Sequence, residues 1–363
     1  MIKVGILFGG KSAEHEISLL SAKNVYDAID RTKFEPVLIG IDKTGRWLLN
    51  DAKRFLLNAG DAAHIKLNPD GKNVVLHPDS GGMISAENTG NISIDVVFPI
   101  LHGPFGEDGT IQGLLKLADI PFVGPGVLGS AAGMDKDVMK RLLRDAGIPI
   151  GKFLALKSHE KMPSFKEIEA AFSCGGVPFF IKPANMGSSV GISKVHNEAE
   201  LSAALKDAFL YDTKVIIEEY IPGREIECAV LGNEEPLASL PGEIIPSHEF
   251  YSYDAKYLDE KGAAFVIPAK LNEEATKRIQ DLAVKVFKTL CCEGLSRVDF
   301  FLKENSGDII VNEINTMPGF TRISMYPKMW EASGVSYTDL ITRLIELAMR
   351  RFEKERKLKT SVV

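Results

Sequence analysis

The sequence predicts an α/β protein: an amino-terminal, doubly wound parallel sheet followed by two smaller β-rich units, the last of α+β type. Three observations support this fold class. Apolar strands alternate with helices up to about residue 150, which is typical of a mainly parallel sheet. A loop of small residues at 183–191 then lies between two short apolar runs. Finally, two apolar segments within 295–315 carry polar residues two positions apart.

The first unit begins with the apolar strand 2–8, which ends in Gly9-Gly10. Further strands are expected at 36–41, 94–101 and 122–123, and helices at 18–29, 110–118 and 137–145. Residues 43–93 are rich in Gly and Asn with little periodicity, and are interpreted as an elaborated insertion. Because ligands of doubly wound sheets gather at the carboxyl ends of strands, the glycine-bearing loops are expected there: 9–12, 102–109 and 124–126.

The two later units have closer strands. The second is expected to contain a hairpin of strands 179–182 and 192–195, then a helix at about 197–209 and a strand at 214–219. The third is expected to contain a helix at 272–290 and paired strands within 295–315. Apolar residues from Leu340 to Ala348 recur at helical spacing, which predicts a packed carboxyl-terminal helix whose charged tail frays after Arg350.

Composition excludes several classes of protein. The 363 residues carry a formal net charge of −6, which does not indicate a nucleic-acid binder. No apolar run approaches the ~20 residues of a membrane span, and the first strand is too short for a signal peptide, so a cytoplasmic protein is expected. The 4 cysteines form no zinc-binding spacing, and the neighbours Cys291 and Cys292 are expected to be buried thiols on a helix.

The most informative segment holds Arg297 and Asp299 on one strand and Glu313 and Asn315 on the next. Each pair lies on one face, because strand side chains alternate. Residues 305–307 can close a three-residue hairpin with a left-handed glycine, which places Asp299 opposite Glu313 and Arg297 opposite Asn315. Facing carboxylates repel unless a cation separates them, and carboxylate and amide oxygens suit Mg²⁺. The alternative is a solvated polar face, against which the apolar neighbours argue.

The loop 185–191 is the candidate phosphate-binding element. Its glycines, Ser188, Ser189 and close backbone N–H groups can cover a triphosphate, and Lys182 precedes it at a strand end. An ordinary hairpin tip is the alternative. The segment 215–225 is expected to join the two β-rich units, with its backbone near adenine and Glu225 near a ribose hydroxyl. Glu218 and Glu219 belong to this contact or are surface carboxylates.

A second phosphate-binding pattern occurs at the amino terminus. Residues 5–12 satisfy G-x-x-x-x-G-K-[ST], but a P-loop needs its flexible loop after the strand ends. Here Gly5 lies within the strand, and Ile6, Leu7 and Phe8 are core-type residues. The match is therefore interpreted as accidental, while a P-loop nucleotide switch is kept as the rival function.

Four runs of residues follow one another along the chain: His102-Gly-Pro-Phe-Gly-Glu-Asp-Gly109, Gly187-Ser-Ser-Val-Gly191, Tyr253-Asp-Ala-Lys-Tyr257, and Gly294-Leu-Ser-Arg-Val-Asp with Glu313-Ile-Asn-Thr-Met-Pro-Gly319. With them the chain resembles the D-alanine–D-alanine ligase family of the ATP-grasp superfamily, and the insertion at 43–93 resembles the longer form of the enzyme. The resemblance implies a substrate-binding domain at 1–135 and a two-part ATP-grasp fold at 136–222 and 223–363.

The reaction implied by the resemblance joins two D-alanine molecules through an acyl phosphate at the expense of ATP, for peptidoglycan synthesis. Phosphoryl transfer needs charge neutralisation more than covalent help. Asp299, Glu313 and Asn315 match ligands of Mg²⁺, with two ions expected and Mn²⁺ as an alternative. Arg297 and the Gly319 backbone match the groups that stabilise the transferring phosphoryl and the tetrahedral oxyanion. Positions that match ATP contacts are Lys136, Lys182, Ser188, Ser189, Glu218, Glu225 and Lys256.

The substrate residues are carried over in the same way. Glu14 matches the carboxylate that holds the ammonium of the first D-alanine, with Ser188 and Tyr257 as its hydrogen-bonding partners. His102 lies near the first substrate in the family, and Ser324 matches a residue that binds the carboxylate of the second. Without the resemblance, Glu14 would be a loop or cap residue and Ser324 a helix cap. The sequence does not identify the group that deprotonates the attacking amine.

Residues 249–263 are predicted to form a lid. They are too polar for a core and carry three tyrosines, and long irregular loops are uncommon unless functional. A lid fits because an acyl phosphate must be shielded from water. Relatives that make a D-alanyl ester carry Phe at the position of Tyr257, so an amine is expected as second substrate.

The resemblance further implies a homodimer formed through the amino-terminal domain. Two other function classes stay open, the P-loop NTPase and a nucleotide-binding regulator with an inactive site. The intact set of Arg297, Asp299, Glu313 and Asn315 argues against the regulator.

Overall fold

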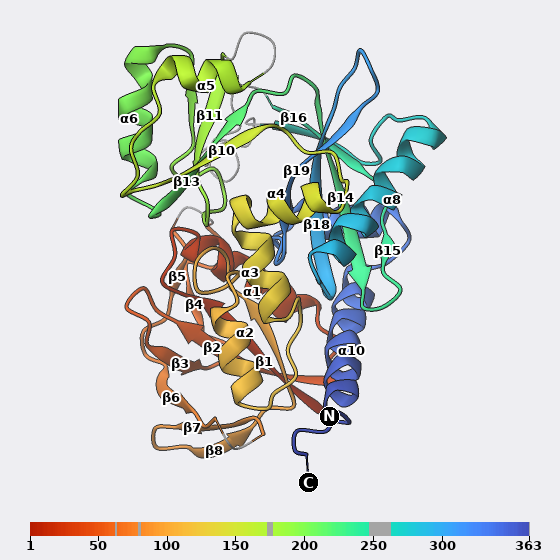
Figure 1. Cartoon of the computed structure of the whole chain (residues 1–363). Coiled ribbons are helices and arrows are strands. Elements are labelled where there is room, and N and C mark those ends of the chain that lie inside the picture. Colours follow the sequence, from red (N-terminus) through yellow and green to blue (C-terminus); the bar gives the residue numbers. More distant parts are fainter. Residues whose placement is uncertain (62–63, 79–80, 173–176, 247–262, 363) are drawn as a thin grey trace.

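The protein is described by a computed structural model that covers residues 1–61, 64–78, 81–172, 177–246 and 263–362. Three main sheets lie one after another along the chain and occupy separate regions of the molecule (Figure 1). The helices are α1 (His15–Ala28), α2 (Thr110–Leu117), α3 (Val127–Met134), α4 (Lys136–Asp145), α5 (Phe165–Ala171), α6 (Glu198–Ala208), α8 (Glu273–Thr289), α9 (Met325–Ala332) and α10 (Tyr337–Glu355).

The first sheet has the strand order β8-β7-β6-β3-β2-β1-β9. Its centre, β1 (Ile2–Gly9) between β2 (Phe34–Ile41) and β9 (Val96–Ile100), is parallel, as the sequence predicts. The insertion contributes antiparallel strands to the same sheet, so the parallel part is smaller than expected. These strands are β3 (Trp47–Asn50), β6 (Lys72–Leu76), β7 (Met83–Ala86) and β8 (Gly90–Ser93), with the separate pair β4 (Leu56–Leu57) and β5 (Lys66–Leu67).

Helix α1 packs on one face of β1. Val4, Ile6 and Phe8 share a core with this helix, while Leu7 faces a second core on the other side of the sheet, as strand alternation requires. The helix begins at His15, earlier than the predicted residue 18. Its N-cap, Glu14, makes no side-chain capping bond, so the usual sequence signal for a helix start is missing. The predicted strand at 122–123 is only a parallel bridge between Phe122 and Val97.

The second sheet confirms the hairpin around the small-residue loop. Strands β11 (Phe179–Pro183) and β12 (Ser193–Val195) are antiparallel, and β13 (Lys214–Glu219) pairs with β11 on the other side. Strand β10 (Phe153–Lys157) and helix α5, which were not predicted, complete this unit. Helix α6 packs on the same sheet.

The third sheet has the order β17-β16-β14-β18-β19, with β15 (Leu237–Ala238) paired to β14. The long strands β14 (Arg224–Gly232) and β18 (Gly294–Leu302) are antiparallel, and β19 (Ile309–Asn315) pairs with β18. Strand β16 (Gly242–Pro246) and the edge strand β17 (Ala263–Val266) flank residues 247–262, which lie outside the described ranges. Helix α8 covers one face of this sheet.

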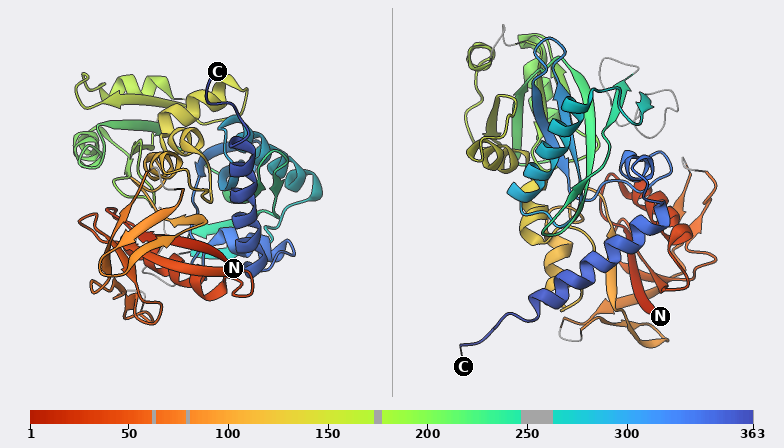
Figure 2. Two further views of the ribbon diagram at one scale, coloured as in Figure 1. Left: turned by 90° about the horizontal axis from the view of Figure 1, so that it is seen from below. Right: turned by 90° about the vertical axis from the view of Figure 1, so that its right-hand side faces the viewer.

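Helix α10 crosses back from the third sheet to the first (Figure 2). Leu340, Leu344 and Ile345 lie in one core with Val4 and Ile6 of β1, so the carboxyl-terminal helix ties the two sheets together. The prediction that the chain frays after Arg350 is wrong, because the helix continues to Glu355.

Arg351 explains why the helix stays packed. Its side chain is 8% exposed and donates hydrogen bonds to the carbonyls of Gly124, at 2.6 Å, and Phe122, at 2.8 Å. It also lies over the Phe122 ring and 3.4 Å from Glu293. A charged side chain in the tail therefore acts as an anchor to the loop after the first sheet.

Of the cysteine prediction, only the burial of Cys292 is confirmed, and that burial raises its pKa. Neither cysteine lies on a helix, because α8 ends at Thr289, and Cys291 is exposed and left-handed, with φ of 54°. Among the residues that the structure describes, no helix is both long and apolar enough to cross a membrane.

Candidate active site

Two adjoining cavities lie where the three sheets meet. The outer cavity, of about 550 Å³, lies between the second and third sheets, and its volume is within the range of about 300–1,000 Å³ typical of ligand pockets. The inner cavity, of about 160 Å³, reaches the loops of the first sheet. The two cavities share lining residues, among them Gly187, Ser188, Glu225 and Glu313. The small-residue loop therefore lies at the boundary between the two cavities.

Strands β18 and β19 bring together the four polar residues of the predicted hairpin. Asp299 pairs with Glu313 and Arg297 with Asn315, as predicted. The turn is longer than predicted, because Lys303 N–H bonds to the Asp308 carbonyl and leaves 304–307 as the loop. Taken alone, that extra residue would shift the register by one. A β-bulge restores it, because Asn312 is an extra residue of β19 opposite the step from Asp299 to Phe300.

Arg297 is the electrostatic centre of the inner cavity. Its Nε and Nη2 donate to the two Asp299 oxygens at 2.7 and 2.8 Å, and its Nε lies 3.0 Å from Glu227 Oε2. Burial alone would lower the pKa of Arg297, but the charges of Asp299 and Glu227 outweigh it and hold the pKa above its usual range. The guanidinium therefore carries a full charge inside the cavity.

The carboxylates beside Arg297 form a donor set that fits a hard cation. Asp299 and Glu313 face each other, and Asn315 Nδ2 lies 3.0 Å from Asp299 Oδ2. Glu313 is also 3.5 Å from the ammonium of Lys136. Within the described part of the chain no three His, Cys, Asp or Glu residues form a metal-binding group, so two carboxylates and one amide are the set on offer. Oxygen donors of this kind suit Mg²⁺.

The small-residue loop closes over Glu14. Ser188 Oγ donates a hydrogen bond to Glu14 Oε1, although 174 residues separate them. A Cβ at Gly103 would lie 2.8 Å from Glu14 Oε2, and a Cβ at Gly187 would lie 3.0 Å from the same atom. Glycine at both positions therefore leaves space for the Glu14 carboxylate. Ser188 and Ser189 have φ of 50° and 61°, a conformation that non-glycine residues rarely adopt. Such conformations concentrate at functional sites.

Lysines gather at the outer cavity around Glu218. Lys140 and Lys182 each lie 2.6 Å from its carboxylate. Burial opposes ionisation of Glu218, but Lys140 and Lys182 outweigh it and lower its pKa to about 2. The interpretation of Glu218 as a surface carboxylate is thus wrong. Lys136 completes the set, with its Nζ 2.7 Å from the carbonyl of Met186 in the loop.

His102 and Glu107 fix the segment that carries Gly319. His102 Nδ1 lies 3.1 Å from the Met317 carbonyl, and burial lowers its pKa to about 4 despite that bond, so the neutral ring donates from Nδ1. Glu107 accepts from Met317 N at 3.2 Å. Burial and the charge of Glu14 raise the pKa of Glu107 to about 8. Gly319 itself leaves no room for a side chain, since a Cβ would lie 2.8 Å from Ser324 Oγ.

Ser324 lines the inner cavity at the start of α9. It occupies the N-cap position but makes no capping hydrogen bond. Its Oγ instead accepts from Thr321 N at 2.9 Å. The reading of Ser324 as a helix cap therefore does not describe its side chain.

Several site residues were missed in the sequence. Glu227, which shares Arg297 with Asp299, follows Glu225 at strand spacing on β14, and this alternation was the available signal. Lys140 lies one helical turn after Lys136 on α4. Glu107 belongs to the motif at 102–109, but its contact with Met317 spans 210 residues. Lys256 and Tyr257, and the predicted lid up to residue 262, lie outside the described residues.

The amino-terminal P-loop pattern is mostly strand in this fold, because β1 extends to Gly9. Gly5 is within β1, and Ile6, Leu7 and Phe8 are buried. The Lys11 ammonium lies 5.8 Å from the ring centre of Phe105, and Lys11 lines neither cavity.

Replacing Lys11 with alanine is therefore expected to leave nucleotide affinity within about threefold of the wild type, since the side chain is remote from both cavities. The measurement is titration calorimetry with ADP and magnesium. Loss of binding in Lys11→Ala would restore the P-loop interpretation.

Comparisons with known proteins agree with this geometry. The family model described as D-ala D-ala ligase N-terminus matches residues 3–125, and the one described as D-ala D-ala ligase C-terminus matches residues 142–346. A D-alanine–D-alanine ligase of Shouchella clausii is 56% identical over 99% of this chain and 98% of its own. D-alanine–D-alanine ligase A of Escherichia coli K12 is 53% identical, with 99% of each chain covered.

Solved structures show the same likeness in three dimensions. The D-alanine-D-alanine ligase from Coxiella burnetii superposes with a TM-score of 0.85 at 40% identity, covering 98% of this chain and 96% of that one. The VanG D-Ala:D-Ser ligase from Enterococcus faecalis gives 0.83 at 41% identity, covering 96% and 99%.

Proposed function

Because the chain belongs to the D-alanine–D-alanine ligase family, we propose that it joins two D-alanine molecules to D-alanyl-D-alanine, with conversion of ATP to ADP and phosphate, for peptidoglycan synthesis. One observation carries the proposal. Arg297, Asp299, Glu313 and Asn315 line the same inner cavity as Glu14 and Ser188, directly beside a cavity of nucleotide size. A carboxylate substrate and a triphosphate can therefore meet at one charged centre.

ATP is assigned to the outer cavity. Lys136 and Lys182 provide positive charge for its phosphates. Burial alone would lower the pKa of Lys182, but the charges of Glu218 and Glu313 outweigh burial and raise it, so Lys182 stays ionised. Ser188 and Ser189 offer donors from the loop, and Glu225 lies where β14 lines both cavities. Lys256 is assigned to the nucleotide by the resemblance alone.

Asp299, Glu313 and Asn315 would hold Mg²⁺, in two ions by the family pattern and with Mn²⁺ as the alternative. Bound there, the metal would supply the charge neutralisation that phosphoryl transfer needs. Both carboxylate oxygens of Asp299 accept hydrogen bonds from Arg297. Asp299 would therefore serve both as a ligand of the metal and as the partner that orients the Arg297 guanidinium in the inner cavity.

The first D-alanine is assigned to the pocket below the loop. The buried carboxylate of Glu14 receives its ammonium, with Ser188 as partner and His102 alongside. A carboxylate oxygen of this first D-alanine attacks the γ-phosphorus of ATP and gives an acyl phosphate and ADP. The amine of the second D-alanine, held by its carboxylate at Ser324, then attacks the acyl carbon. Arg297 and the Gly319 N–H stabilise the oxyanion, and phosphate leaves.

A phosphate-release assay tests this proposal. ATP and magnesium are supplied with D-alanine, L-alanine, D-serine or D-lactate as the amino-acid or hydroxy-acid substrate. D-alanine is expected to give phosphate and dipeptide in equal amounts, and L-alanine neither. Since the relative from Enterococcus faecalis is named a D-Ala:D-Ser ligase, D-serine with D-alanine is the arm that separates the two second substrates. Phosphate release without any amino acid would contradict the ligase assignment.

The replacement Tyr257→Phe is expected to raise ester formation from D-lactate relative to dipeptide formation, because relatives that make esters carry Phe there. The assay is product partitioning in mixtures of D-alanine and D-lactate over a range of pH. Tyr253→Phe, in the same segment, is the matched control. Equal partitioning in Tyr257→Phe and the wild type would remove Tyr257 from the specificity argument.

The proposal includes a homodimer formed by the amino-terminal domain, with domain boundaries near residues 135 and 222 and a cytoplasmic location. Helices α2 and α3, which contact each other, expose Leu117 at 77% and Leu128 at 65%, and these two leucines are the contact residues that the proposal assigns. Light scattering is expected to give twice the mass of 39.7 kDa. A monomer would contradict the dimer, and Leu117→Asp with Leu128→Asp is expected to produce one.

A further inference from the structure

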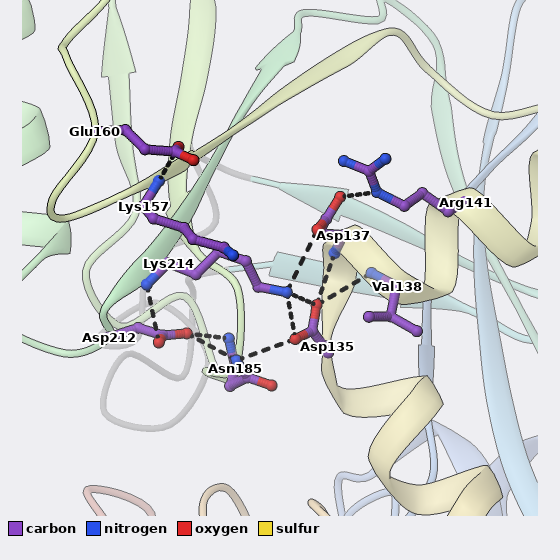
Figure 3. Close-up of polar contacts among 9 residues, drawn as sticks. All are labelled: Asp135, Asp137, Val138, Arg141, Lys157, Glu160, Asn185, Asp212 and Lys214. Carbon is purple, nitrogen blue, oxygen red and sulfur yellow. Dashed lines mark hydrogen bonds and ion pairs between the residues drawn. The ribbon is translucent and has the colours of Figure 1, made fainter.

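A cluster of charged residues lies at the start of the phosphate loop (Figure 3). None of its members lines either cavity. Its centre is the ammonium of Lys214 on β13, which lies 2.6 Å from Asp135 Oδ2 and 3.4 Å from Asp137 Oδ2. Arg141 also pairs with Asp137, at 2.6 Å. We call Asp135, Asn185, Asp212 and Lys214 the Lys214 cluster.

The cluster holds the first residue of the phosphate loop. Asn185 donates its backbone N–H and its Nδ2 to Asp212 Oδ2, at 2.8 and 2.9 Å, and its Nδ2 lies 3.5 Å from Asp135. The other oxygen of Asp212 accepts the backbone N–H of Lys214 at 3.1 Å. The loop at 185–191 thus starts from a residue that is bonded on both sides.

The same cluster fixes the start of α4. Asp135 caps this helix by accepting from the backbone N–H groups of Asp137 and Val138, both at 3.1 Å. The next residue, Lys136, donates its backbone N–H to the Ala184 carbonyl at 3.0 Å and its Nζ to the Met186 carbonyl at 2.7 Å. Lys136 and the loop, both assigned to the phosphates of ATP, therefore share one support.

We propose that Lys214 is a positioning residue that sets the phosphate loop and Lys136 in register with each other, through Asp135 and Asn185, although none of the four touches the nucleotide. This inference rests on the assignment of ATP to the outer cavity. Without the ammonium, Asp135 and Asp137 lose the cation that ties the start of α4 to β13, and Arg141 remains as the partner of Asp137 alone. The two neighbouring carboxylates then repel each other, and the loop and Lys136 are held together less firmly. Lys214 thus affects nucleotide affinity indirectly, through the positions of the phosphate loop and Lys136.

The test is the variant Lys214→Met, with ADP and magnesium bound in a calorimeter. The dissociation constant is expected to rise about tenfold, since residues that act through packed contacts change binding by such amounts. Lys214→Arg, which keeps the charge, is expected to restore most of the affinity. Lys157→Met is the matched control, because Lys157 is exposed and pairs with Lys214 in register on the neighbouring strand.

Two further measurements separate positioning from general stability. Hydrogen exchange of amides 186–191 is expected to accelerate in Lys214→Met and not in Lys157→Met. Asn185→Ala keeps every charge of the cluster but removes the side chain that holds the start of the loop, so ADP binding is expected to weaken by about several-fold. This variant replaces Lys214→Met if Lys214→Met does not fold. A lower melting temperature in Lys214→Met with unchanged ADP affinity and unchanged exchange would overturn the inference. Failure of the wild type to bind ADP would instead contradict the proposed function.

Discussion

Replacing Arg297 with methionine is expected to lower kcat by about 10³-fold, the loss typical of a missing oxyanion donor. Methionine keeps much of the length of the side chain but removes the charge that lies between Asp299 and Glu227. The measurement is dipeptide formation at saturating ATP and D-alanine, with ADP affinity and melting temperature recorded to show that the variant is folded.

Arg297→Lys is the matched variant. It keeps a positive charge but cannot bond both Asp299 oxygens in the present fork geometry, so an intermediate loss is expected. A kcat of Arg297→Met within tenfold of the wild type would show that the reaction does not use this guanidinium.

Replacing Arg351 with alanine is expected to lower the free energy of unfolding by about 3 kcal/mol, because the buried carbonyls of Phe122 and Gly124 lose their donor. The loss also frees α10 from the loop that follows the first sheet. Urea unfolding followed by circular dichroism measures the change.

The adjacent Arg350 provides the control, because it lies on the same helix but is exposed. Arg350→Ala is expected to change the free energy of unfolding by less than about 0.5 kcal/mol. Equal effects of the two replacements would mean that Arg351 is no anchor, whatever its hydrogen bonds.

The sequence was most informative where a pattern repeats at strand spacing. The pairing of Asp299 with Glu313 was predicted correctly, but from a three-residue turn that the structure does not contain. A longer turn and the bulge at Asn312 offset each other, and neither leaves a clear mark in the sequence. The alternation of Arg297 with Asp299 was the sound part of that argument.

Other features depend on contacts that local patterns cannot reveal. The short strands of the insertion alternate weakly between buried and exposed residues, as β6 and β8 do, so no periodicity indicated them. Arg351 looks like one more charge in a polar tail until its partners 227 and 229 residues away are known. Glu14 likewise becomes a site residue only when Ser188 reaches it from the second sheet.

The most direct test of the account follows oxygen from substrate to product. D-alanine labelled with ¹⁸O in both carboxylate oxygens is incubated with the enzyme, ATP and magnesium, and the released phosphate is analysed by mass spectrometry. If the carboxylate attacks the γ-phosphorus beside Arg297, each phosphate carries one ¹⁸O atom from D-alanine. Phosphate free of label would contradict the acyl-phosphate reaction, and with it the assignment of the two cavities.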